Sequence, residues 1–337
     1  MNLILELIKY MMIFLIGVYT FYCFHVFRCR NKKSQDRSYR LLTTFIFMFH
    51  FTGNFALYFQ LRSDKLIILY VGETILFIMI IAFYQAFYPR LSKLLLRNML
   101  MLLSIGFIVL TRLSFDKAIR QVFIVGIASL VGLFVPIAIK RFVWLKRFGW
   151  IYGIAAILLL VVVLVAGTTN YGATNWLNIA GFQFQPSEFV KLLFVFCIAS
   201  LFEEGTDFKH VLSVSVMAGV TVIILVLQRD LGGALIFFVT YVFMLYAATT
   251  KPVYLLSGLA GGSLAAFVAY NLFDHVKVRV MAWANPFRYI DDEGYQISQS
   301  LFAIGTGGWF GMGLNQGLPT SIPVVDSDFV FSAIAEE

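Results

Sequence analysis

Charged residues are scarce in this sequence. Asp, Glu, Lys and Arg make up 13% of its 337 residues, against about 25% in a typical soluble domain. Hydrophobic residues make up 60%, which is too many for a chain that must cover its surface with polar groups. This composition excludes a cytoplasmic enzyme, a disordered tail, a coiled coil and a secreted disulfide scaffold. The apolar stretches are continuous rather than alternating, which excludes a transmembrane β-barrel.

Cysteine is also rare, with residues only at positions 23, 29 and 197. They form no C-x-x-C pair and no even-numbered set, so neither a disulfide framework nor a zinc site is expected. No G-x-x-x-x-G-K-[ST] loop occurs, so nucleotide binding is not supported. The excess of 26 Lys and Arg over 18 Asp and Glu indicates positive cytoplasmic loops of a membrane protein rather than nucleic-acid binding.

The sequence contains many long apolar runs, and ten of them have about the length of a membrane-spanning helix. They lie at about 4–27, 41–59, 66–88, 98–111, 122–139, 149–167, 188–202, 211–227, 231–249 and 253–273, and an eleventh begins at Phe329. We therefore expect an all-α, polytopic helical bundle in a membrane, with an eleventh helix that has only begun at Glu337.

The distribution of Lys and Arg predicts the orientation of these spans. The polar segments between them fall into two alternating sets, and the set that begins with 28–40 holds 15 basic residues against nine in the other. Cytoplasmic loops carry the excess of basic residues, which places the first set inside. The N-terminus and the two informative polar segments, 168–187 and 274–328, are then expected outside.

Two charged residues follow the first outer segment. Glu188 and Lys191 lie three positions apart, on one face of a helix. A charge within a span is costly and usually faces the bundle interior or a watery cavity. The pair is either structural, fixing how helices pack, or it presents a cation to an anionic substrate.

For other polar residues too, a simple structural role is the alternative to a functional one. Asp230 lies in a short polar break and can simply cap the following helix. Arg112 belongs to a basic cluster that is typical of a solvated face. In the second outer segment, Asp291 and Asp292 precede a third carboxylate, and their mutual repulsion can raise one pKa toward that of a general base. The alternative there is an acidic turn before a helix that starts near Tyr295.

Taken together, these motifs closely resemble those of the SEDS family, the shape, elongation, division and sporulation proteins such as FtsW, RodA and SpoVE. The matching segments, in chain order, are Arg112 with Gln121, Trp176-Leu177 with Gln185-Pro186-Ser187-Glu188 and Lys191, Gln228 with Asp230-Leu231-Gly232, Arg279 with Asn285-Pro286 and Gly294-Tyr295-Gln296, and Asp328-Phe329 with Glu336-Glu337. The resemblance covers about 98–337 and makes 1–97 an added region of three spans. It also implies a core of ten helices, so that C-terminal helices are missing after Glu337.

The resemblance implies a polymerase that joins lipid II into peptidoglycan glycan strands at the outer face of the bacterial cytoplasmic membrane. Its implied partner is a class B penicillin-binding protein. A carboxylate, Asp291 or Asp292, would act as the base, and a divalent cation, Mg or Mn, is a candidate cofactor. The implied substrate-binding residues are Arg112, Trp176, Glu188, Lys191, Asp230, Arg279 and Gln296.

Three positions depart from the family pattern. Asn175 replaces a common Arg, and Arg229 replaces a Pro. The family's essential loop Asp falls three residues after the Asn-Pro pair, where this chain has Tyr289. The base has therefore shifted to a neighbouring carboxylate, or the protein is not a polymerase. A lipid II flippase and a non-catalytic scaffold for the penicillin-binding protein are the open alternatives.

Overall fold

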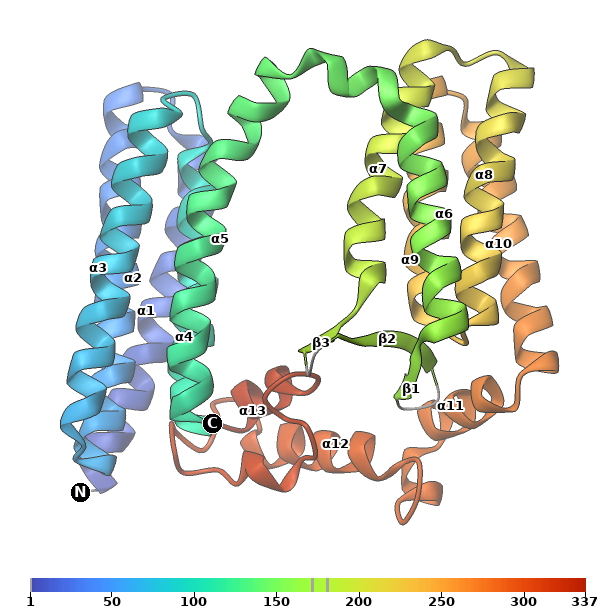
Figure 1. The fold of residues 1–337 in the computed structure, drawn as a ribbon. Helices are drawn as coiled ribbons and strands as arrows, with labels where there is room; N and C mark the ends of the chain where they lie inside the picture. The colour runs from blue at the N-terminus through green and yellow to red at the C-terminus, as the bar shows by residue number, and fades with distance from the viewer. Residues whose placement is uncertain (1, 171–172, 180–181) are drawn as a thin grey trace. The chain divides into compact units, whose positions relative to one another are not determined.

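The computed structural model describes residues 2–170, 173–179 and 182–337 (Figure 1). The chain forms two compact units. Unit 1 consists of Met1–Ile137 and Val278–Glu337, and unit 2 consists of Ala138–Lys277. Both units are built almost entirely from α-helices, as the sequence predicts.

Unit 1 starts with five long helices, of which α2 is the centre, because α1, α3 and α4 all contact it. Apolar residues recur along α2 every three or four positions, which places them on one face, and Leu42, Ile46 and Leu57 are almost completely buried there. The helices are α1 (Asn2–Arg28), α2 (Lys32–Leu61), α3 (Asp64–Phe87), α4 (Lys93–Leu113) and α5 (Phe115–Arg141).

A buried polar pair joins two of these helices. His50 on α2 and Glu73 on α3 are fully buried, and their Nε2 and Oε2 atoms are 3.1 Å apart. The other ring nitrogen of His50 lies 3.2 Å from the Ser104 hydroxyl on α4. Charged side chains inside a bundle need such partners because removal from water is costly. The pair thus links α2, α3 and α4.

The second part of unit 1 contains most of the second predicted outer segment, 274–328. It is mostly helical, and the helix expected near Tyr295 is confirmed. Its elements are α11 (Asp274–Ala284), which begins in unit 2, η2 (Pro286–Tyr289), α12 (Tyr295–Gly307), η3 (Pro319–Ser321) and α13 (Val330–Glu336). No side chain fits at Gly307, because its Cα faces the Ala335 carbonyl of α13. This glycine lets α12 and α13 approach closely.

Unit 2 is a second helical bundle that carries a small sheet. Helix α6 packs along α7, α8 packs against α9, and α10 packs against α9. The Phe194 and Phe237 rings meet at its core, 4.9 Å apart. Its elements are η1 (Val143–Phe148), α6 (Gly149–Ala166), β1 (Thr168–Asn170), β2 (Ala173–Ile179), β3 (Phe182–Phe184), α7 (Pro186–Glu204), α8 (Phe208–Leu227), α9 (Leu231–Thr249) and α10 (Pro252–Leu272).

The first outer segment forms strands that sequence analysis does not predict. Sequence analysis treats 168–187 only as a polar segment, of which residues 171–172 and 180–181 lie outside the described residues. The structure instead pairs β1, β2 and β3 as an antiparallel sheet, with Thr168 opposite Trp176 and Leu177 opposite Phe184. Strand pairing satisfies backbone N–H and C=O groups that a loose loop near the membrane would leave without partners.

Nine segments among the described residues are long and apolar enough to cross a membrane, and they correspond to α1–α6 and α8–α10. The tenth predicted span, α7, is a helix of 19 residues that carries four charged residues, Glu188, Lys191, Glu203 and Glu204. Helix α10 buries none of its residues within the protein. Its apolar surface suits lipid rather than water. The expected multi-pass helical membrane protein is therefore confirmed.

Candidate functional site

The residues proposed from sequence divide between the two units. Unit 1 contains Arg112, Arg279, Asp291, Asp292 and Gln296, and unit 2 contains Trp176, Glu188, Lys191 and Asp230. Each group has its own local geometry.

Arg112, at the end of α4, is held inside unit 1 rather than on a solvated face. Its Nε donates to Glu337 Oε1 at 3.1 Å and its Nη2 donates to the Gly317 carbonyl at 3.3 Å. The side chains of Arg112 and Glu337 are only 15% and 6% exposed. A buried ion pair of this kind is costly to break, because the remaining charge has no partner. Arg112 thus ties α4 to the end of α13 and to the loop before it.

The loop of residues 308–318, which we call the glycine loop, is held by several hydrogen bonds. Its backbone N–H groups at Met312 and Gly313 donate to the last two carbonyls of the described chain, at 2.7 and 2.9 Å. Its Leu318 N–H donates to Glu336 Oε1 at 2.9 Å. The loop requires glycine at Gly311 and Gly313, whose φ angles are 71° and 111°.

Gln60, at the end of α2, contacts the same loop and was missed from sequence. Its Nε2 donates to the Leu314 carbonyl at 2.8 Å, and its Oε1 accepts from Asn315 Nδ2 at 2.6 Å. No motif marks this glutamine, because its partners lie 254 and 255 positions away. Glu336 and Glu337 did have a signal, since both belong to a matching motif, yet sequence analysis assigned them no role.

Asp291 and Asp292 lie in the turn between η2 and α12. Gly294 N–H closes this turn by donating to the Tyr289 carbonyl at 2.9 Å. Both carboxylates are exposed, and among the described residues neither forms an ion pair or a side-chain hydrogen bond. Tyr289, at the family's Asp position, is half-buried, with its hydroxyl 3.8 Å from the Met281 sulfur. The two carboxylates are thus available to an external partner.

Arg279 and Gln296 are exposed in the same way. Arg279 lies on α11 and Gln296 in the first turn of α12. Within the described ranges, neither side chain has a hydrogen-bond partner in the protein. The structure does not bring either of them into contact with the two aspartates.

In unit 2, Glu188 and Lys191 form the expected pair at the start of α7. Lys191 Nζ lies 2.7 Å from Glu188 Oε1, and the two side chains are 34% and 56% exposed. The two residues therefore form an ion pair on one helix, as they would if their role were structural. The pair is also exposed enough to leave the Lys191 ammonium accessible. The geometry is therefore compatible with a structural role and with binding of an anionic substrate.

Asp230 caps α9, as its simplest reading predicts. Its Oδ1 accepts from the Gly233 N–H at 2.8 Å, and its Oδ2 accepts from Asn175 Nδ2 at 3.4 Å. Arg229, at the family's Pro position, has φ 60°. Proline is held near about −65° and cannot adopt this conformation. The substitution of the family's Pro thus accompanies a change in the local backbone.

Trp176 lies on β2 and directly follows Asn175, whose side chain contacts Asp230. Its side chain is half-buried, and its carbonyl accepts a hydrogen bond from the Thr168 hydroxyl at 3.2 Å. The sheet therefore holds Trp176 and Asn175 at the end of unit 2 where α9 begins.

The described residues do not form a complete divalent-cation site by themselves, so the Mg or Mn ion stays a prediction. They contain no group of three or more His, Cys, Asp or Glu side chains placed to hold a metal. Mg and Mn prefer several oxygen ligands, and Asp230 already uses both oxygens within the protein.

Within each unit, the polar segments that contact one another belong to the same predicted set, outer or inner. In unit 1, Gln60 and Arg112 both reach the glycine loop, and all of these segments belong to the predicted outer set. In unit 2, Asn175 meets Asp230 in the outer set, whereas Lys146 meets Glu203 at 2.5 Å in the inner set. The alternation is consistent, and the assignment of one set to the outside stays a prediction.

A family model described as a cell cycle protein, that of FtsW, RodA and SpoVE, matches residues 85–337. The chain belongs to this family. The resemblance found in the motifs is therefore confirmed, and α1, α2 and most of α3 precede the matched region. The boundary predicted at residue 97 stays a prediction.

Several curated relatives are named peptidoglycan glycosyltransferases. The RodA of Mycobacterium leprae is 31% identical over 281 residues, which are 75% of this chain and 60% of that protein. The RodA of Mycobacterium tuberculosis H37Rv is 35% identical over 212 residues, 57% of this chain and 45% of that protein. A probable FtsW of Geobacter sp. M18 is 33% identical over 63% of this chain and 60% of that protein. The chain thus spans about half of these relatives' length.

A solved structure shares the fold. It belongs to work on the coordination of polymerization and crosslinking by a peptidoglycan synthase complex. Its TM-score is 0.53 at 25% sequence identity, and the match covers 79% of this chain and 70% of that one.

Proposed function

We propose that this protein polymerises lipid II into glycan strands at the outer face of the bacterial cytoplasmic membrane, beside a class B penicillin-binding protein. One observation carries the proposal: the family match over residues 85–337 includes relatives named peptidoglycan glycosyltransferases. The nine apolar helices support it, because a substrate with a long isoprenoid tail keeps that tail in lipid.

The chemistry needs a carboxylate base. A sugar 4-hydroxyl attacks the anomeric carbon of lipid II, a new glycosidic C–O bond forms, and the bond to the lipid diphosphate breaks. The hydroxyl proton passes to a carboxylate, and the lipid diphosphate leaves with the electron pair. Asp291 and Asp292 suit the role of base because both are exposed in a turn of the predicted outer segment.

The leaving diphosphate needs cations. Arg279 in unit 1 and Lys191 in unit 2 are the better candidates, since the first is exposed and the second is partly so. Glu188 would orient Lys191. Arg112 is already engaged by Glu337 and Gly317, so we propose that it positions the glycine loop. Trp176, Asp230, Gln296 and a Mg or Mn ion stay predictions.

The test is glycan-strand synthesis from labelled lipid II by the full-length protein with its penicillin-binding protein. The double variant Asp291→Asn, Asp292→Asn keeps side-chain size and removes basicity, so synthesis should fall by about 10²-fold or more. The matched control is Glu293→Gln, which changes the neighbouring exposed carboxylate and should keep most activity. Synthesis at the parent rate by the double variant would show that the base lies elsewhere.

A non-catalytic scaffold is the second candidate, because Tyr289 occupies the family's Asp position and its phenol is a poor base at neutral pH. If the parent protein makes no glycan but still raises crosslinking by its partner, the scaffold is correct. If it makes no glycan yet moves labelled lipid II between leaflets, the flippase is correct.

A further inference from the structure

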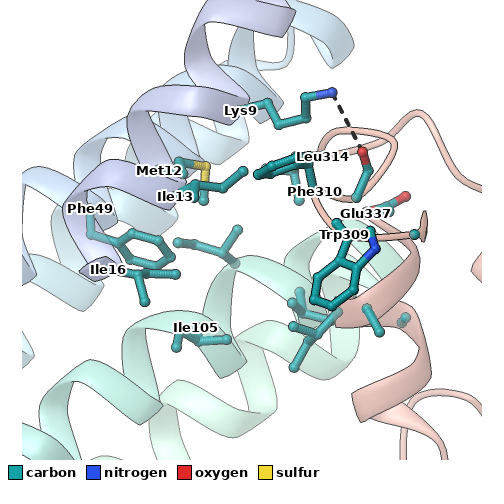
Figure 2. Close-up of a pocket in the computed structure, with 17 residues that line it drawn as sticks. Lys9, Met12, Ile13, Ile16, Phe49, Ile105, Trp309, Phe310, Leu314 and Glu337 are labelled. Atoms are coloured by element: carbon teal, nitrogen blue, oxygen red, sulfur yellow. Dashed lines mark hydrogen bonds between the residues drawn. The ribbon is translucent and has the colours of Figure 1, made fainter. Parts of the chain in front are cut away.

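Unit 1 contains an apolar cavity of about 340 Å³ (Figure 2). Its walls come from α1, α2, α4, α13 and the start of the glycine loop. Figure 2 shows Met12, Ile13 and Ile16 of α1 on one side and Ile105 of α4 on another. This volume lies at the lower end of the range of about 300–1,000 Å³ for small-molecule pockets. The cavity has room for an apolar chain.

Two charged residues line the cavity, and one of them lacks a counter-ion. Glu337 is paired with Arg112. Lys9 donates to the Gly311 carbonyl at a long 3.5 Å, and its ammonium lies 4.9 Å from the centre of the Tyr10 ring. In the part of the chain that the structure describes, no carboxylate lies within ion-pairing distance of Lys9. The cavity therefore has one uncompensated positive charge.

Lys9 lies near one end of the candidate span formed by α1. Helix α1 has 27 residues and is about 40 Å long at 1.5 Å per residue, whereas the hydrocarbon core is about 30 Å thick. Lys9 is about two turns from the start of α1, and a lysine side chain can extend its ammonium toward the interface. A phosphate at the membrane surface is within its reach.

We propose that this cavity binds one acyl chain of an anionic phospholipid, with the lipid phosphate on the Lys9 ammonium. An acyl chain gains little by moving from lipid into an apolar cavity, because both environments are apolar. Selectivity must therefore come from the contact between ammonium and phosphate. The cationic group and one wall of the site come from α1, which precedes the family match, and most of the other lining residues belong to the matched region.

A lipid bound here contacts the glycine loop. Trp309 and Phe310 belong to the cavity wall, and the Phe310 ring packs edge-on against Tyr10 with centroids 6.4 Å apart. Gln60 holds the same loop from α2. The lipid thus joins the N-terminal helices to a loop of the family core.

Photo-crosslinking in lipid nanodiscs tests the site. The full-length protein is reconstituted with phosphatidylglycerol that has a photoactivatable acyl chain, and crosslinked peptides are quantified by mass spectrometry. We expect crosslinks on α1 and on the glycine loop above the background measured around Ile68, which faces away from the bundle. Lys9→Gln should lower this yield about five-fold. Lys65→Gln, an exposed lysine in the same predicted outer set, should not change it.

Two further experiments test whether the phosphate and the cavity are both needed for binding. Diacylglycerol with the same photoactivatable chain lacks the phosphate, so its yield should be low and insensitive to Lys9→Gln. Ile13→Trp fills the cavity and should remove the crosslinks of both probes. An equal phosphatidylglycerol yield in parent and Lys9→Gln overturns the proposal. Displacement of phosphatidylglycerol by an equimolar polyprenyl diphosphate also overturns it, because the cavity would then belong to an isoprenoid lipid.

Discussion

Lys191 is the residue for which sequence and structure allow two opposite roles. Its partner Glu188 is one helical turn away, and both side chains are partly exposed to solvent. Exposed ion pairs contribute only about 0–1 kcal/mol to stability. A residue whose loss costs so little stability is free to serve a substrate, so the two roles predict different results.

We expect Lys191→Ala to abolish glycan-strand synthesis while membrane abundance stays close to that of the parent. Synthesis is measured from labelled lipid II, and abundance is measured by immunoblot of the membrane fraction. The control is Lys277→Ala, since Lys277 forms an equally local pair with Asp274 at 3.0 Å on α11 and should retain activity. If Lys191→Met lowers abundance as much as activity, Lys191 is structural.

Arg112 and Asp230 show how a polar residue's role depends on its partners. From sequence, Arg112 belongs to a basic cluster and Asp230 to a polar break. Asp230 caps a helix through Gly233, three positions away, which is a local contact that sequence can predict. Arg112 pairs with Glu337, 225 positions away, which no local pattern indicates.

At the scale of elements, the glycine loop is held by parts of the chain that are far apart in sequence. Gln60 of α2 makes two hydrogen bonds to it, and the end of α13 accepts from three of its N–H groups. Its left-handed positions at Gly311, Gly313 and Asn315 make it a shape that few other sequences adopt.

We predict that Gln60→Ala loosens the glycine loop without unfolding unit 1. Two hydrogen bonds are lost, each contributing about 0.5–1.5 kcal/mol. Hydrogen–deuterium exchange should therefore become faster in residues 308–318, while α2 and α4 keep their protection. Gln85→Ala is the matched control, because Gln85 on α3 makes no side-chain hydrogen bond among the described residues. Unchanged exchange in the Gln60 variant would show that the other contacts of the loop, with α13 and Arg112, are enough to hold it.

At the scale of the whole molecule, orientation is the prediction with the widest consequences. The excess of basic residues in one set of polar segments places the sheet, the glycine loop and the two aspartates outside. Contacts within each unit confirm which segments share a face, but they do not distinguish inside from outside.

Thiol labelling in intact cells tests this orientation. In a variant without native cysteines, Asn178→Cys on β2 and Glu293→Cys before α12 should react with an impermeant reagent. Both positions are exposed. Thr206→Cys, exposed between α7 and α8, should react only in inverted vesicles. Labelling in the reverse pattern would place the candidate base in the cytoplasm and would contradict the proposed reaction.

Helix positions follow from local composition, and sequence analysis located all ten long helices. Ends differ mostly by a few residues, because polar turns such as Lys32 to Arg40 continue a helix beyond the bilayer. The sheet of unit 2 was missed because two of its strands have only three residues, and such short strands are stable only when they are paired with a partner strand. Helix α13 has Phe329 at its N-cap position, without a side-chain hydrogen bond.

The sequence by itself determined that this is a helical membrane protein of the FtsW, RodA and SpoVE family, and where its long helices lie. Burying some 20 apolar residues in lipid is a local property, because a helix satisfies its own backbone hydrogen bonds. Only the tertiary structure decided the partners of Arg112, Gln60 and Lys9, and with them the glycine loop and the cavity beside it. Those contacts join residues more than 200 positions apart, and they exist only after the helices of unit 1 have packed.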